Sequence, residues 1–255
     1  MKLTVLGSSG SVPGPDNAAS GYYLSVPGMP GVLLDIGGGV LGAMQKYGIN
    51  PSDSHVLLSH LHADHCSDFP SLMVWRRYHP QSHASQAHMC IGPSDTPVRM
   101  GLASADEFAK PDDMSDTLQF RPWTTEGYME LGPLRLRAFP AIHPIEAYSM
   151  RIEMPKDRVL AYSGDSAFNE NLIECARGAD IFICEATWGK SSAGQPPAMH
   201  LSGPEAGIVA REAGVKHLLI THIPPWCDPA DSLNGARSEF DGPITLARPG
   251  ESYSF

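Results

Sequence analysis

The stretch Ser59-His-Leu-His-Ala-Asp-His65 decides the fold and the chemistry that this chain predicts. It directly follows the apolar run 56–58, which is typical of a short buried strand. Three imidazoles and one carboxylate therefore fall within six residues at the end of a strand. Imidazole and carboxylate together suit Zn, Mn, Fe or Co. The pattern predicts a metal site that uses His60, His62, Asp64 and His65, with a solvated histidine run as the alternative.

Further candidate ligands follow other apolar runs. His143 comes after the run 134–139, Asp165 ends the turn Ser163-Gly164-Asp165 after the run 159–162, and His222 follows the run 218–221. Each of these is weak evidence alone, because a single histidine at a strand end is more often structural. Together, four such clusters at the ends of four strands would fill two metal sites.

The order of strand and helix signals predicts an α/β fold. Runs parted by glycine, proline or charged turns indicate strands at 3–6, 21–26, 32–35, 56–58, 87–91, 118–120, 128–131, 134–139, 148–153, 159–162, 181–184 and 217–221. Helices are expected at 41–47, 69–78, 96–108, 172–177 and 204–213. This arrangement favours a sheet sandwich with helices on its outer faces. No repeat or linker-like shift interrupts the chain, so we expect a single domain over residues 1–255.

Composition limits the partners. The 255 residues include 18 basic and 28 acidic side chains, a net charge of −10, which argues against a general nucleic-acid binder. No apolar run approaches the roughly 18 residues that span a bilayer, so no membrane partner is expected. The five cysteines form no CxxC pair, and the start MKLTVLGSSG is too short and broken for a signal segment. We expect a cytoplasmic protein.

The order HxHxDH, His, Asp in an SGD turn and TH after a strand resembles the metallo-β-lactamase fold superfamily over nearly the whole chain. The resemblance implies an αββα four-layer sandwich with two divalent metal ions at one edge. Zinc is the first expectation, with manganese or iron as alternatives. By the family pattern one ion is held by His60, His62 and His143, the other by Asp64, His65 and His222, and Asp165 bridges them. Typical lactam-cleaving members carry a cysteine near the Asp165 position, which this chain lacks.

Two features resemble the RNase Z-like phosphodiesterase branch of that superfamily. One is the N-terminal loop GSSGSVPGPDNAAS, and the other is Glu185 followed by the HLS motif at His200. In that branch the histidine meets the scissile phosphate and the glutamate orients it. The open alternatives are a helix-capping neighbour for His200 and a surface carboxylate for Glu185. RNase Z itself has a long arm between the positions of His143 and Asp165, and the single hairpin expected here argues against tRNA processing.

Four stretches look most like an actinobacterial group that resembles atypical class II cyclic-nucleotide phosphodiesterases: GSSGSVPGPDNAASGY, DIGGGVLGA, LLSHLHADHCSDFPSLMVWRRYHP and LLITHIPPW. The resemblance implies hydrolysis of a 3′,5′-cyclic nucleotide such as cAMP, or of a similar small phosphodiester, by metal-bound hydroxide. Asp64, His200 and Glu185 are the expected catalytic residues. The alternatives are an RNase Z-like tRNA 3′-end endonuclease, a sulfatase- or lactonase-like hydrolase, and a non-catalytic metal protein. Whether the chain forms a homodimer stays open.

Two further groups of residues each have a structural and a functional interpretation. The basic cluster Arg76-Arg77-Tyr78-His79 is read as an exposed helix end, with a contact to a nucleotide phosphate or to a neighbouring subunit as the alternative. Trp75, Trp188 and Trp226 are expected in core or interface packing, with stacking on a base as the alternative.

Overall fold

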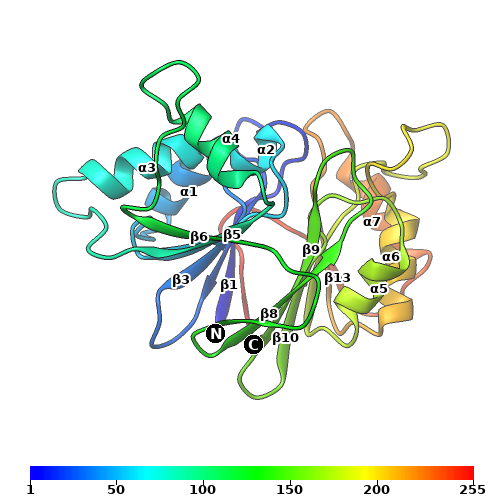
Figure 1. Ribbon diagram of the computed structural model, residues 1–255. Coiled ribbons are helices and arrows are strands. Elements are labelled where there is room, and N and C mark those ends of the chain that lie inside the picture. Colours follow the sequence, from blue (N-terminus) through cyan, green and yellow to red (C-terminus); the bar gives the residue numbers. More distant parts are fainter. The chain divides into compact units, whose positions relative to one another are not determined.

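The computed structural model describes all residues 1–255, which form two compact units (Figure 1). The N-terminal unit comprises residues 1–8, 12–123 and 248–254, and the C-terminal unit comprises residues 9–11, 124–247 and 255. Each unit contains one seven-stranded sheet with its own helices. The prediction of a single domain stays a prediction.

The sheet of the N-terminal unit is antiparallel at one side and parallel at the other. In spatial order its strands are β14 (Ser252–Ser254), β1 (Lys2–Gly7), β2 (Gly21–Ser25), β3 (Gly31–Leu34), β4 (Ser54–Leu57), β5 (His88–Gly92) and β6 (Leu118–Pro122). The strands from β3 to β6 run parallel. Its helices are α1 (Val40–Lys46), α2 (Ala63–Cys66), α3 (Phe69–Tyr78) and α4 (Thr96–Ala103). Because β3 and β4 are parallel, the residues that follow them share one edge of the sheet.

The sheet of the C-terminal unit has the same mixed character. Its strands are β13 (Ile244–Leu246), β12 (Leu218–Thr221), β11 (Ile181–Glu185), β10 (Arg158–Tyr162), β9 (Tyr148–Met154), β8 (Leu134–Pro140) and β7 (Met129–Leu131). The strands from β10 to β13 run parallel. Its helices are α5 (Glu170–Ala176), α6 (Gly203–Ala213) and α7 (Pro229–Arg237). The carboxyl ends of β10, β11 and β12 therefore meet at one edge, where ligands of such sheets commonly bind.

A buried apolar cluster fixes the helices of the C-terminal unit on their sheet. Val209 and Ala210 of α6 belong to one cluster with Phe182 of β11 and Leu218 and Ile220 of β12. The helix is well defined at both ends. A capping box with Glu205 closes its start, and Gly214 ends it in the left-handed conformation with φ 64°.

Most predicted elements are present, and α3 has the predicted bounds of 69–78. The helix expected over 96–108 is wrong in its second half, because α4 ends at Ala103. Asp112 N donates to Gly101 O at 2.9 Å, so the returning chain takes up a carbonyl that a longer helix would have used. The short α2, the helix α7 and the strands β13 and β14 were not expected. No helix of the chain has the length and apolarity to cross a membrane.

Candidate metal centre

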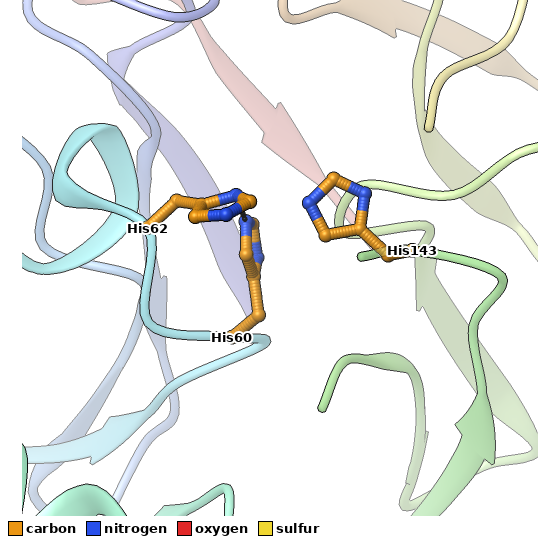
Figure 2. Close-up of side chains that lie close together, drawn as sticks. All are labelled: His60, His62 and His143. Carbon is orange, nitrogen blue, oxygen red and sulfur yellow. Dashed lines mark hydrogen bonds between the residues drawn. The ribbon is translucent and has the colours of Figure 1, made fainter. Parts of the chain in front are cut away.

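The histidine motif of the N-terminal unit lies where β4 ends and α2 begins. His60 and His65 are buried, and His62 and Asp64 are partly exposed. Extended backbone up to His62 places His60 and His62 on the same side of the chain, and His60 Nε2 lies 3.2 Å from His62 Nδ1 (Figure 2). The first turn of α2 then presents Asp64 and His65, whose carboxylate oxygen and Nε2 lie 3.6 Å apart. The motif thus presents four potential ligands from six consecutive residues.

Asp35 supports this motif from the end of β3, and sequence reasoning missed its role. Its side chain is completely buried, and its Oδ2 lies 2.7 Å from His65 Nδ1. The same carboxylate accepts hydrogen bonds from the backbone N and the Oγ of Ser59, both at 2.7 Å. An ionised carboxylate can only accept, so the proton of His65 lies on Nδ1 and Nε2 is the nitrogen able to bind a metal. The signal available in the sequence was an acidic residue at the end of the apolar run 32–35, since such residues are rarely buried without a partner.

Gly37, in the segment after β3, allows the backbone of α2 to pack directly against that segment. A Cβ at this position would lie 1.9 Å from the backbone oxygen of Asp64, a distance that no side chain tolerates. Backbone hydrogen bonds run from Ile36 N to His65 O and from Ser20 N to Asp64 O. The backbone at Ile36 and Ser20 therefore holds the histidine motif directly, and Gly37 leaves room for this close approach.

In the C-terminal unit, four strand ends and one loop supply the other predicted residues. His143 follows β8, Asp165 follows β10, Glu185 ends β11 and His222 follows β12, while His200 precedes α6. His222 Nε2 lies 3.5 Å from Asp165 Oδ1, and His200 Nδ1 lies 3.7 Å from Asp165 Oδ2. Potential ligand atoms of Glu185, His200 and His222 lie within 4.8 Å of one another.

Neighbouring acceptors fix the rings of His143 and His222. His143 Nδ1 lies 3.0 Å from the carbonyl oxygen of Met199, which can only accept, so Nδ1 carries the proton. His222 Nδ1 lies 2.9 Å from Thr187 Oγ1, and that hydroxyl is also 2.9 Å from Glu185 Oε2. Metal-ligating histidines typically have their other ring nitrogen held in this way.

Glu185 and the partly buried His200 form a pair beside Asp165. Glu185 is completely buried, so the alternative of a surface carboxylate is wrong. Its Oε1 accepts from Ser166 N at 2.9 Å and lies 3.0 Å from His200 Nδ1. His200 does not cap α6, because Ser202 is the N-cap residue. The ring of Trp188 meets that of His200 edge to face, with centroids 5.0 Å apart.

The donor set of each unit fits a divalent metal ion. Two ligand atoms bound to one ion at about 2.0–2.2 Å lie roughly 3.4 Å apart in tetrahedral geometry. The His65–Asp64 and His222–Asp165 separations of 3.6 and 3.5 Å are close to that value. Cys66 adjoins the motif, but burial raises the pKa of its thiol to about 11, which disfavours the thiolate form that binds metals.

Two residues of the basic cluster have structural partners. Arg76 is buried, so its interpretation as part of an exposed helix end is wrong. Its guanidinium donates to the carbonyl oxygens of Ser52 and Thr117 at 2.9 and 2.6 Å. Arg77 forms ion pairs with Asp112 and Asp116. These contacts give no support to a phosphate-binding role for Arg76 or Arg77.

The tryptophans have different surroundings. Trp188 contacts His200, as described above, and lies next to the candidate centre. Trp75 packs against the ring of His79, with centroids 4.2 Å apart. Trp226 is 68% exposed, so it does not lie in the core, and its expected packing at an interface stays a prediction.

These sheets, with histidine and aspartate side chains gathered at strand ends, define a metal-dependent hydrolase. Residues 32–223 match the family model described as a β-lactamase superfamily domain, and the chain belongs to that superfamily. This family match and the relatives described next confirm three predictions: the α/β metallo-β-lactamase fold, the RNase Z-like branch and the class of metal-dependent hydrolase.

Relatives cover nearly the whole chain. Over 244 residues the chain is 50% identical to the protein Rv1339 of Mycobacterium tuberculosis, which covers 96% of this chain and 88% of the relative. It is 30% identical over 254 residues to the probable metallo-hydrolase YhfI of Bacillus subtilis, 98% of each protein. The YhfI crystal structure matches with a TM-score of 0.83 at 25% identity, over 99% of this chain and 98% of that one. The short form of human tRNase Z shares the fold, with a TM-score of 0.78 at 20% identity, over 100% and 99% of the two chains.

Proposed function

We propose that this hydrolase is a phosphodiesterase that acts on a 3′,5′-cyclic nucleotide such as cAMP, or on a similar small phosphodiester. The observation that carries the proposal is the pair of the buried Glu185 and the partly buried His200 beside Asp165. A histidine held by a buried carboxylate can donate a proton to a phosphate oxygen or to a leaving alkoxide. The likeness in fold to a tRNase, whose substrate is joined by phosphodiester bonds, also supports this reaction class.

The metal ligands of the proposal follow the family pattern. His60, His62 and His143 would hold one ion, Asp64, His65 and His222 the other, and Asp165 would bridge the two. Two bound divalent ions would lower the pKa of a water molecule toward neutrality and neutralise charge on the phosphoryl group. The His/Asp donor set suits zinc first, with manganese or iron as alternatives.

The chain's own residues would then place the substrate and move the proton. Glu185 accepts from Ser166 N and Thr187 Oγ1, so its carboxylate is fixed before any ligand arrives. Because a carboxylate can only accept, it holds a proton of His200 on Nδ1. His200 Nε2 is then the atom that would donate to the leaving oxygen. Asp64 would orient the attacking water in addition to its role as a ligand.

The second candidate is cleavage of tRNA 3′ ends. Its support is the 26% identity over 301 residues to the ribonuclease Z of Haloarcula marismortui, together with the shared fold. The segment between His143 and Asp165 contains only the hairpin of β9 and β10. A hairpin offers little surface for a folded RNA, so we place the small substrate first.

Hydrolysis of 3′,5′-cyclic AMP by the metal-loaded protein tests the proposal, with Asp165→Ala as the control. We expect turnover by the wild type and none by the variant. Absence of turnover by a protein with confirmed bound metal would reject a cyclic nucleotide as the substrate. Cleavage of precursor tRNA under the same conditions would favour the second candidate.

A further inference from the structure

The N-terminal loop GSSGSVPGPDNAAS ends at a serine that no step of the proposed function uses. This residue, Ser20, directly precedes β2 and is completely buried. The loop is closed near its start by Asn17, whose Oδ1 accepts a hydrogen bond from Ser8 N at 3.0 Å. The chain therefore returns from the end of β1 to the start of β2 along a fixed path, which delivers Ser20 to the interior of the N-terminal unit.

Backbone hydrogen bonds attach Ser20 to the histidine motif. Ser20 N donates to Asp64 O at 3.1 Å, and Ser20 O accepts from Gly37 N at 3.0 Å. The next residue, Gly21, packs so tightly that a Cβ there would lie 2.4 Å from Val40 Cγ2. Because the backbone of Ser20 is held on both sides, its hydroxyl can change position only by rotation about the Cα–Cβ bond.

The Ser20 hydroxyl has one hydrogen-bond partner, the Nε2 atom of His65, at 3.4 Å. Asp35 holds the other ring nitrogen, so Nε2 is the atom of His65 that can bind a metal. The carboxylate of Asp64 lies beside the same nitrogen, with its Oδ2 at 3.6 Å. The Ser20 hydroxyl and the Asp64 carboxylate are thus both neighbours of one metal-binding atom.

Metal binding would remove the one partner of this buried hydroxyl. The lone pair of Nε2 cannot bind an ion and take part in a hydrogen bond with Ser20 at the same time. A buried hydroxyl without a partner destabilises the folded protein, and alanine would fill nearly the same space without that cost. Packing alone therefore does not require a hydroxyl at this position. Once the metal is bound the hydroxyl needs another acceptor, and ionised carboxylates are the strongest acceptors among side chains.

We propose that Ser20 is a positioning residue of the metal centre, whose hydroxyl turns from His65 to the carboxylate of Asp64 when the metal binds. A hydrogen bond to one oxygen of a ligating carboxylate fixes the orientation of the ligand. The same hydrogen bond would hold Asp64 for the orientation of the attacking water. The inference rests on the metal centre of the proposed function, and it adds the residue through which the N-terminal loop acts on that centre.

Zinc affinity of the full chain, measured by competition with a chelator, tests this role. We expect Ser20→Ala to bind zinc about tenfold more weakly than the wild type, because loss of a group that orients a metal ligand typically costs about 10–100-fold. Ser54→Ala is the matched control, since it removes another buried hydroxyl of the N-terminal unit, at the start of β4, and should bind zinc like the wild type. Equal or tighter zinc binding by Ser20→Ala would overturn the proposal.

Two further arms separate this role from a purely structural one. The visible absorption of bound Co²⁺ depends on the arrangement of its ligands, so Ser20→Ala should change that spectrum, and a spectrum identical to that of the wild type would count against the role. Ser20→Gly removes the same hydroxyl and should show the same loss of zinc affinity if Ser20→Ala fails to fold; normal affinity in Ser20→Gly would overturn the proposal. A wild-type protein that binds neither zinc nor cobalt would reject the metal centre and the proposed function together, whereas equal binding by the wild type and Ser20→Ala rejects only the role of Ser20.

Discussion

Replacement of Arg76 by methionine should strongly destabilise the N-terminal unit. The Arg76 side chain is 1% exposed and has no carboxylate partner. It ties the end of α3 to three other segments through the carbonyl oxygens of Ser52 and Thr117 and through His88 Nδ1. Burial lowers its pKa to about 10, which reflects the cost of keeping this cation out of water.

The magnitude follows from the groups that lose a donor. Methionine fills a similar volume but removes a donor from three buried acceptors, of which Thr117 O keeps its hydrogen bond from His88 N. The other two acceptors are left unsatisfied at about 1–3 kcal/mol each, or roughly 2–6 kcal/mol in all. Removal of the buried charge returns part of this as desolvation free energy. The expected net loss is about 1–3 kcal/mol, a sizeable part of a typical stability of about 5–15 kcal/mol. With a urea slope of about 2–3 kcal/mol per molar, the unfolding midpoint should fall by about 0.5–1 M.

Urea unfolding of metal-free protein, followed by circular dichroism, measures this loss. Arg77→Met is the matched control, because the neighbouring arginine makes its ion pairs with Asp112 and Asp116 near the surface and should cost only about 1 kcal/mol. Equal midpoints for Arg76→Met and Arg77→Met would refute the reasoning. An Arg76→Met protein more stable than the wild type would show that desolvation outweighs the hydrogen bonds.

Three other predictions test the candidate centre and the histidines. Asp35→Asn should weaken metal binding about 10–100-fold in chelator competition, because it removes the carboxylate that fixes the ring of His65; an unchanged affinity would contradict this. Glu185→Gln should lower kcat of any phosphodiester hydrolysis about 10²–10⁴-fold with a smaller change in KM, whereas a purely structural glutamate would leave kcat of the folded variant intact. Burial lowers the pKa of His55 to about 4 from its ordinary value of 6.5, so its contribution to stability is complete above pH 6.5 and is lost as the pH falls toward 4. His55→Gln should therefore lose less stability than the wild type between pH 7 and pH 5 in urea unfolding, and parallel losses would disprove the assignment.

The strained backbone at the candidate centre is one feature that the sequence does not predict. Asp35 and His222 both have left-handed backbone conformations, with φ of 57° and 58°, although neither is a glycine. Such conformations persist where surrounding contacts hold them, and they concentrate at functional sites. Hydrogen bonds from Ser59 to Asp35 and between His222 and Thr187 supply those contacts. No local pattern marks either residue as strained.

The predicted ligands could be found from the sequence because their signals are local. Each of them follows an apolar run that forms a strand, and parallel neighbours necessarily end at the same edge of a sheet. Spacing therefore indicated the histidine motif, Asp165 and His222, whereas Glu185 was predicted from the resemblance to the RNase Z-like branch. The helix expected over 96–108 failed for the opposite reason, since contacts with the returning segment near Asp112 end it.

The sequence by itself determined most of the strands and helices and the residue types offered to a metal, because periodicity and strand-end chemistry depend on neighbouring residues, and its motifs carried the resemblance to the superfamily. Only the tertiary structure showed that Asp35 holds His65 and that Met199 holds His143, contacts that span 30 and 56 residues. It also decided that Arg76 is buried while Arg77 pairs near the surface, and that Arg137 faces Arg151 across a ladder. Adjacent or similar cations acquire different roles because burial and pairing depend on the segments that fold against them, which no local pattern specifies.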